Sequence, residues 1–494
     1  MTELLSFEKS RQNAHGPRLP EADVESPGPD DVLPRELLRA QPPGLPRLSE
    51  PEIMRHYSRL ASMNYSISEQ FYPLGSCTMK YNPVANEAAA ALPGFTDLHP
   101  YQDEETVQGA LSLMWRLEQA LCAVVGVDRV TLQPAAGAHG EWTALRMIQA
   151  FHRSRGEART EVLVPDSAHG TNPASAALSG FRVVEVRSGP DGRISLADLE
   201  SKLSPRVAAL MLTNPNTLGL FEREILDVAE IVHATGAMLY YDGANLNAFM
   251  GICRPGDMGF DAVHMNLHKT FTTPHGGGGP GAGPVGVKAD LVPFLPTPTV
   301  ERMNGQLKLD FKRPKSIGRV RSFYGNFGML VRAYTYIVAM GGDGLTQASL
   351  DAVLGANYLR HEVEGLLEMP HEGPCMHEFV ASARNLAPRG IKALDVAKGL
   401  LERDFYAPTI YFPLVVPEAI MVEPTETESK ATLDAFAAAI KEIVRQADES
   451  PETLHEAPHG LPVGRLDEVA TARHINAYLQ GQSEDPILRW KKAP

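Results

Sequence analysis

The chain has 494 residues, of which 43% are hydrophobic and 21% are charged, and its formal net charge is -14. This is an ordinary globular composition, with enough apolar material for more than one packed core. The acidic balance argues against a domain that grips nucleic acid, because such domains are usually basic. Because the negative net charge repels anions, a substrate phosphate or carboxylate must be bound by individual polar or cationic groups in its site.

Cysteine usage and hydropathy indicate a protein of a reducing compartment. The four cysteines form no CxxC pair, so we expect no disulfide framework. The N-terminal residues lack the apolar stretch of a signal peptide and contain acids that a transit peptide avoids. No apolar run is as long as a membrane span. We expect a soluble, cytoplasmic protein.

The composition changes along the chain predict three regions. Residues 1–60 are rich in proline and charge and cannot bury a core alone, so we expect an N-terminal arm. Residues 61–335 are expected to form the large domain, with its boundary near a helical segment at 329–340. Residues 336–494 are expected to form a smaller α+β domain and tail, with an amphipathic helix at 429–446.

Alternating helical and strand periodicity predicts an α/β large domain. A helix is expected over 105–125 and another from Glu141. Strands are expected at 130–132, 161–164, 181–186, 207–212, 238–241, 261–265 and 284–287. Strands separated by helix-length segments indicate a mainly parallel sheet with helices on both faces. Such a sheet binds ligands at the carboxyl ends of its strands.

Two residues at predicted strand ends suggest a pyridoxal-phosphate (PLP) site. Asp242 ends the strand 238–241, and Lys269 follows the next strand in the segment 266–275, just before a glycine run. A buried acid keeps the pyridine nitrogen of PLP protonated, and a lysine holds the aldehyde as a Schiff base. Taken alone, Asp242 could equally be a helix N-cap, whereas Lys269 has few charged neighbours and fits a surface lysine poorly.

The loops after three other strands carry groups that suit the same cofactor. Ala136, Gly137 and Ala138 join a strand to a helix, where small residues and free N–H groups can hold a phosphate. His169 could stack on a flat ring, with Ala244 against the opposite face. Thr213 could orient a ring oxygen. Each loop has an ordinary alternative, namely a strand–helix turn, a polar loop histidine or a proline turn.

Two further clusters are more ambiguous. The loop 71–83 could line a substrate mouth, and its polar candidates are Ser76, Cys77, Thr78, Lys80 and Asn82. His371, Cys375 and His377 are potential metal ligands, but no fourth ligand is apparent, so no metal site is predicted. No Gly-Lys-Ser/Thr follows either glycine-rich loop, which disfavours nucleotide binding.

Together these motifs resemble the glycine decarboxylase family, the P-protein of the glycine cleavage system. The matching segments are 73–83, 137–141, 167–176, 242–247, 266–271 and 321–326. They follow the family's order over about residues 50 to 430. The chain is roughly half as long as the single-chain members, so it resembles the PLP-bearing subunit 2 of the split bacterial form. One departure is His139, where many single-chain members carry glutamine.

The resemblance implies a fold-type I PLP enzyme that decarboxylates glycine and transfers its aminomethyl group to the lipoyl arm of H-protein. It implies Lys269 as the Schiff-base residue, Asp242 as the partner of the ring nitrogen and His169 as the stacking group. His268 would contact phosphate or transfer a proton. It also implies an α2β2 assembly with a homologous subunit 1. The glycine run after His275 would be a mobile wall that admits the lipoyl arm.

Two other interpretations remain open from the residues. One is another fold-type I enzyme, either a different amino-acid decarboxylase or a desulfurase. A desulfurase needs a mobile nucleophilic cysteine, and the glycine-rich loop carries none. The other is a non-catalytic assembly subunit that binds PLP only structurally. The presence of both Asp242 and Lys269 favours a catalyst.

Overall fold

The computed structural model describes residues 3–11, 14, 16, 20–41, 44–275, 281–461 and 463–473. The chain forms two compact units, one of Ile67–His455 and one that joins Met1–Ser66 with Glu456–Pro494. These units do not correspond to the predicted domains, whose boundaries are at residues 60 and 335. The domain division stays a prediction. Among the described residues, none of the helices combines the length and apolar character that crossing a bilayer requires.

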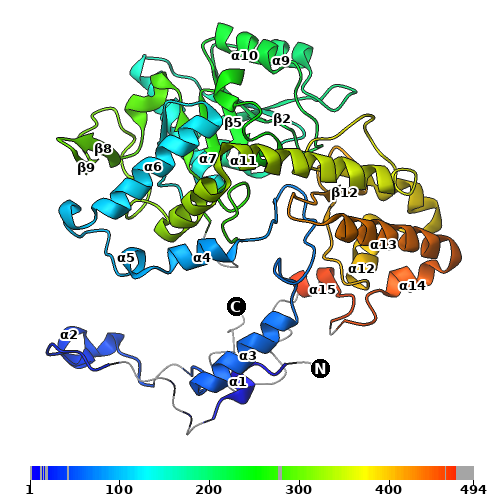
Figure 1. Ribbon diagram of the computed structural model, residues 1–494, viewed down its shortest axis with the longest axis horizontal. Helices are drawn as coiled ribbons and strands as arrows, with labels where there is room; N and C mark the ends of the chain where they lie inside the picture. The colour runs from blue at the N-terminus through cyan, green and yellow to red at the C-terminus, as the bar shows by residue number, and fades with distance from the viewer. Residues whose placement is uncertain are drawn as a thin grey trace. The chain divides into compact units, whose positions relative to one another are not determined.

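A seven-stranded sheet organises the larger unit (Figure 1). Its strand order is β1-β7-β6-β5-β4-β2-β3. The strands are β1 (Arg129–Thr131), β2 (Glu161–Pro165), β3 (Arg182–Val186), β4 (Val207–Thr213), β5 (Met238–Gly243), β6 (Ala262–Met265) and β7 (Val285–Val287). Strands β2 to β6 pair in parallel, and β7 is antiparallel to both β6 and β1. The predicted mainly parallel sheet is therefore confirmed.

Alternate residues of the central strands pack into two different cores. Leu239 and Tyr241 of β5 face a core built with α6 (Gln108–Val125), α10 (Ile225–Ala234) and the first half of α11 (Phe327–Val363). Met238 and Tyr240 face the opposite core, built with α7 (Gly137–Ser154) and α8 (Thr171–Leu178). Two covered faces explain why these strands read as continuous apolar runs. The sheet is thereby fixed between two helical layers.

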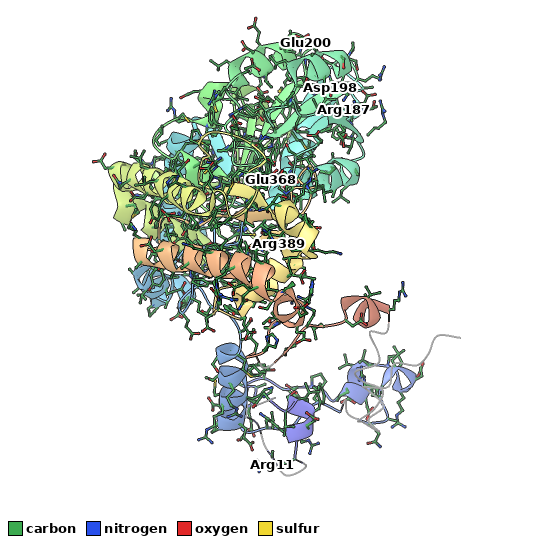
Figure 2. All side chains as sticks on the ribbon, turned by 90° about the vertical axis from the view of Figure 1, so that its right-hand side faces the viewer. Arg11, Arg187, Asp198, Glu200, Glu368 and Arg389 are labelled. Carbon is green, nitrogen blue, oxygen red and sulfur yellow. The ribbon has the colours of Figure 1, made fainter. Side chains whose placement is uncertain are left out.

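Further elements border this sheet. Helix α9 (Leu196–Lys202) contacts the edge strand β3. Charged side chains lie at this end of the unit, as Arg187, Asp198 and Glu200 show in Figure 2. The Asp198 carboxylate accepts the Arg187 N–H at 2.7 Å. Two short helices, α4 (Val84–Ala90) and α5 (Pro93–Thr96), precede α6.

The C-terminal part of the larger unit has its own core. Strands β10 (Phe379–Ser382), β12 (Ala419–Val422) and β11 (Thr409–Ile410) form an antiparallel sheet in that order. Helices α12 (Ala393–Leu401), α13 (Lys430–Glu449) and α14 (Pro451–Glu456) belong to the same region. Its apolar side chains form one cluster with Ala356, Leu359 and Val363 of α11. The predicted α+β character of this region is therefore confirmed.

The smaller unit contains short helices and one longer one. They are α1 (Ser6–Lys9), α2 (Pro29–Val32), α3 (Glu50–Ser62) and α15 (Glu468–Arg473). A charged cluster ties α3 to the preceding chain: Glu3 accepts from Arg59 at 2.9 Å and lies 2.9 Å from His56 Nδ1. Polar contacts of this kind suit a segment whose composition cannot supply an apolar core.

Two local expectations differ from the structure. Helix α7 begins at Gly137 rather than at Glu141, because the glycines of its first turn allow it to start against Asn266 and Gly283, where a larger residue would collide. The hairpin of β8 (Thr299–Met303) and β9 (Gln306–Asp310) was not anticipated. Its turn is Asn304-Gly305, with φ of 51° and 83°, which is the pair that a two-residue hairpin favours.

Candidate active site

Asp242 lies at the carboxyl end of β5 and is only 2% exposed. Its Oδ2 accepts Asn172 Nδ2 at 2.8 Å, and its Oδ1 accepts the Ala244 N–H at 3.0 Å. His264 Nε2 lies 3.5 Å from the same Oδ1. Burial alone would raise the pKa of Asp242, but His264, Asn172 and the Ala244 N–H together lower it. The site therefore holds a buried, ionised carboxylate.

Lys269 lies four residues beyond the end of β6, the strand that pairs with β5. Its backbone N–H donates to the Asn266 carbonyl at 3.1 Å, which forms a turn shortly after the strand. Its Nζ donates to the Ser76 carbonyl at 2.6 Å. The amine is half-buried and directed into the protein, as a lysine that must capture an aldehyde requires.

A cradle for an anion lies at the start of α7. Ala136 is the N-cap, and no side chain caps the helix, so its first N–H groups face the site with a partial positive charge. A Cβ on Gly137 would lie 2.6 Å from Asn266 Oδ1, and one on Gly283 would lie 2.1 Å from the Ala136 carbonyl oxygen. Only glycine permits this close approach of the two backbones.

We expect Gly283→Ala to weaken cofactor binding strongly. The added methyl group must displace the Ala136 carbonyl, and this displacement rotates the first N–H groups of α7 away from the phosphate position. Losing one or two charge-assisted hydrogen bonds raises the dissociation constant about tenfold or more. Fluorescence titration with PLP measures the effect. Gly109→Ala, where a Cβ meets nothing within 4 Å, is the control and should bind normally.

The predicted ring contacts lie around the same strand ends. Thr213 pairs with Asp242 in the β4–β5 register, and its buried Oγ1 has no partner among the described residues. His169 is exposed, and its Nδ1 accepts the Thr171 N–H at 3.2 Å, which leaves the proton on Nε2. Ala244 follows β5 directly and is half-buried. Their roles towards a ring stay predictions.

His268 is half-buried and precedes Lys269 in the chain. Its Nδ1 accepts the Ala282 N–H at 3.3 Å, and its ring lies edge-on to His275 at 5.0 Å between centroids. Burial, followed by the nearby His275 and Lys269, lowers the pKa of His268 to about 3. A neutral imidazole can hydrogen-bond a phosphate but is a poor proton donor at neutral pH. The residues Gly276–Pro280, to which the mobile-wall prediction applies, lie outside the described residues.

We expect the protein to lose stability as the pH falls below about 6.5. Burial lowers the pKa of His268 and of His377 to about 3 each, whereas both groups titrate near 6.5 in the unfolded chain. The unfolded state then binds more protons, so between pH 6.5 and 5 each histidine costs about 2 kcal/mol. Denaturant unfolding across this range measures the loss. His268→Gln should flatten the dependence, and an unchanged slope would contradict the assignment.

The predicted substrate loop lies against Lys269. Ser76, Thr78 and Lys80 are buried, and the Ser76 carbonyl is the group that accepts the lysine amine. Lys80 Nζ donates to Glu426 at 2.7 Å and to Asn247 at 2.8 Å. Cys77 is half-buried and has a raised pKa because of burial.

Asn82, near the end of the loop, contacts the chain segment that follows Lys269. Its Nδ2 donates to the Thr272 carbonyl at 2.8 Å, three residues past Lys269. The loop is therefore joined to the lysine segment at two points. Whether any of its side chains binds substrate stays a prediction.

A separate acidic group lies behind this loop. Atoms of His377, Glu378 and Glu423 lie within 4.8 Å of one another, and all three side chains are fully buried. This is the one group of potential metal ligands among the residues that the structure describes. His371 and Cys375 do not belong to it. Cys375 instead pairs through its backbone with Asn357.

Sequence reasoning missed five residues of the site. Carboxylate, amide and imidazole groups hold Asp242, the lysine segment and the loop, and they come from Asn172, His264, Asn266, Glu378 and Glu423. Asn172 and Asn266 were inside quoted motifs but had no role there. Glu378 directly precedes β10, and Glu423 directly follows β12. A charged residue next to an apolar strand segment is the sequence signal that could have identified them.

Comparison with known proteins decides the family. Residues 141–279 match the family described as Aminotransferase class-V, and residues 348–459 match Glycine dehydrogenase, C-terminal domain. A protein of Caldanaerobacter subterraneus subsp. tengcongensis, named probable glycine dehydrogenase (decarboxylating) subunit 2, is 56% identical over 489 residues, 99% of each chain. The chain belongs to the glycine dehydrogenase (decarboxylating) subunit 2 family.

Other comparisons agree with this family. The relative of the same name from Thermotoga maritima is 55% identical over 487 residues, covering 98% of this chain and 99% of the relative. A crystal structure of glycine decarboxylase (P-protein) of the glycine cleavage system, in inhibitor-bound form, superposes with a TM-score of 0.71. That likeness, at 22% identity over 84% of this chain and 95% of the other, is one of fold. The fold-type I prediction is confirmed.

Proposed function

We propose that this glycine dehydrogenase subunit 2 uses PLP to decarboxylate glycine and to pass the aminomethyl group to a lipoyl disulfide. The observation that carries the proposal is the pair of Asp242 and Lys269 at the ends of neighbouring strands, together with the α7 cradle. Full-length similarity to proteins named glycine dehydrogenase (decarboxylating) subunit 2 supports the reaction. It also distinguishes this reaction from other fold-type I chemistries.

The residues present fit the cofactor. The start of α7 supplies N–H groups for a phosphate, and two buried oxygens near the strand ends, Thr213 Oγ1 and Asn266 Oδ1, have no hydrogen-bond partner among the residues that the structure describes. When bound, PLP supplies an aldehyde that an amine can capture and a ring that accepts the electrons of the breaking bond. Asp242 would hold the proton at the ring nitrogen. Lys269 would carry the cofactor and yield its place to the glycine amine.

The protein's own part in the reaction is positioning and charge. The scissile bond to the carboxylate must stand perpendicular to the ring plane, so the walls around Lys269 must fix the substrate's rotation. His169 and Ala244 would hold the ring from its two faces. In the proposed transfer the aminomethyl carbon, which loses CO2 and is oxidised, would bond to one sulfur of the lipoyl disulfide, and the other sulfur would leave as a thiolate that takes up a proton. The disulfide is thereby reduced.

The named partners belong to the same proposal. As a subunit 2, the chain would act with a homologous subunit 1, in an α2β2 assembly, and with lipoylated H-protein as the co-substrate. We place the assembly in the cytoplasm. We also propose that residues 61–335 and 336–494 act as the large and small domains of a fold-type I enzyme, with residues 1–60 as an arm.

Exchange of labelled bicarbonate into the carboxyl group of glycine tests the proposal. The full chain, subunit 1 and lipoylated H-protein are combined, and label in glycine is counted. We expect exchange that depends on all three proteins. Exchange that is absent from the complete mixture, although the chain binds PLP, would favour the alternative of a non-catalytic assembly subunit. Decarboxylation of another amino acid in its place would favour a different decarboxylase.

A further inference from the structure

The turn Ser76–Thr78 is held in a conformation that its residues do not favour. Ser76 has φ of 63° and Thr78 has φ of 39°, both in the left-handed region that non-glycine residues rarely adopt. The turn offers the Ser76 carbonyl to Lys269 Nζ at 2.6 Å. A strained turn persists only where its surroundings fix it, so the groups that hold it also fix the lysine amine.

Two buried glutamates hold this turn. Glu378 Oε2 accepts the Ser76 N–H at 2.7 Å, and Glu423 Oε2 accepts the Thr78 N–H at 2.9 Å. Glu378 Oε1 also accepts Asn245 Nδ2 at 3.0 Å, which links the turn to the loop that follows β5 and Asp242. Both carboxyl groups are fully buried. One short turn is therefore tied to the C-terminal sheet and to the strand that carries the acid.

The carboxylates are committed to this turn rather than to a metal ion. Three of their four oxygens already accept hydrogen bonds, from Ser76, Asn245 and Thr78. Within the part of the chain that the structure describes, the fourth oxygen, Glu423 Oε1, has no hydrogen-bond partner, and His377 Nε2 lies 3.8 Å from it. A metal site would need most of these lone pairs free.

Charge also couples the pair to the lysine. Burial, and then the neighbouring Glu423, raise the pKa of Glu378, and burial raises the pKa of Glu423 to about 7. Lys269 opposes this rise in both groups, so negative charge on either carboxyl group favours the cationic form of the lysine nitrogen. The other ionisable groups beside it are Lys269, Lys80 with Glu426, His377 and Cys77.

We propose that Glu378 and Glu423 are positioning residues, which clamp the strained turn and so fix the place and the cationic state of the Lys269 nitrogen. The inference rests on the proposed function, because it takes Lys269 to be the residue that carries PLP. Glu378 is the main clamp, since it holds two donors. Glutamine at this position cannot accept both hydrogen bonds, because its amide NH2 would face one of the donors.

The test uses holoenzyme assembled with subunit 1 and three variants: Glu378→Gln, the double variant Glu378→Gln/Glu423→Gln, and Glu222→Gln. Glu222 is a matched control, since it is 3% exposed and accepts Ile194 N–H and Asn216 Nδ2 at about the same depth. The readouts are the circular dichroism of the visible cofactor band, the midpoint of its pH titration, and kcat and KM for glycine.

We expect Glu378→Gln to change the dichroism of the band and to lower kcat about tenfold to a hundredfold, with KM changed less than about threefold. The double variant removes both ionisable carboxyl groups and should lower the titration midpoint by about 1 pH unit. Glu222→Gln should leave band and midpoint unchanged, even where it lowers the melting temperature. An unchanged band and kcat in Glu378→Gln, or an equal effect in Glu222→Gln, would overturn the proposal.

The Asn245 side chain offers a milder test of the same clamp. If Glu378→Gln does not accumulate with cofactor bound, Asn245→Ala, which removes one hydrogen bond to Glu378, is measured in the same way. A weaker change of the same kind supports the clamp, and an unchanged band overturns it. A failure of the proposed function is distinguishable, since the wild-type holoenzyme would then lack either the visible band or the exchange reaction.

Discussion

Replacing Lys269 by alanine is expected to abolish both the visible absorbance band of the bound cofactor and the exchange of bicarbonate into glycine. The proposed function assigns the covalent link with the aldehyde to this amine, whose Nζ donates to the Ser76 carbonyl. Activity should fall by about 10⁴-fold or more, since removing a covalent catalyst leaves only binding and electrostatic effects. Absorbance before and after borohydride, with mass spectrometry of the chain, measures the link.

Lys288→Ala is the matched control for this experiment. Lys288 is also half-buried and donates through Nζ to a backbone carbonyl, that of Gly126 at 2.9 Å, but it lies at the end of β7 rather than at the β5–β6 ends. Its variant should keep the band and the exchange activity. A band that persists in Lys269→Ala and survives borohydride would place the cofactor on another residue.

Replacing Asp242 by asparagine is expected to lower kcat about 10³-fold while the cofactor stays bound. The neutral amide cannot hold a proton on the ring nitrogen, so the ring loses its capacity to accept electrons. Because the pKa of Asp242 is lowered, the wild-type group is ionised across neutral pH. The loss should therefore be the same at pH 6 and at pH 9. Single-turnover spectra of the variant with glycine measure it.

Asn172→Ala gives a graded comparison. It removes one hydrogen bond at 2.8 Å from Asp242 Oδ2 but leaves the carboxylate and its contact with His264. We expect a loss of about tenfold in kcat, which corresponds to one hydrogen bond to a charged group. Equal losses in the two variants would show that packing around Asp242, rather than its charge, determines the rate.

Sequence reasoning located Asp242 and Lys269 because both follow apolar strand segments, and the ends of parallel strands meet at one edge of a sheet. The same argument placed Thr213 and His169 near them. It predicted the start of α7 four residues late, because glycine and alanine there were taken as a turn. The small residues instead let the helix begin against Asn266 and Gly283. Close approach between distant backbones is a property of the tertiary fold.

The contacts of Glu378 and Glu423 with the turn Ser76–Thr78 could not be predicted from the sequence. Glu378 and Glu423 reach the turn from strands of another sheet, more than 300 positions along the chain. Their burial follows from the pairing of β10 with β12, and β11 has only two residues, too few for a periodic signal. The motif 73–83 was recognisable as a unit, but its contacts depend on which segments fold over it.

Helix α11 connects two cores, since Met329 to Ala348 pack with the large sheet and Ala356 to Val363 pack with the small one. Gly341 interrupts it with φ of 62° and ψ of -177°, a backbone state that is essentially restricted to glycine. The helix therefore changes direction at this single pivot, and because a Cβ there would meet no atom within 4 Å, it is the backbone state rather than lack of space that requires glycine. Alanine at this position would favour helical backbone angles and a straight α11. We expect this to move the C-terminal layer, with Glu378 and Glu423, away from Lys269.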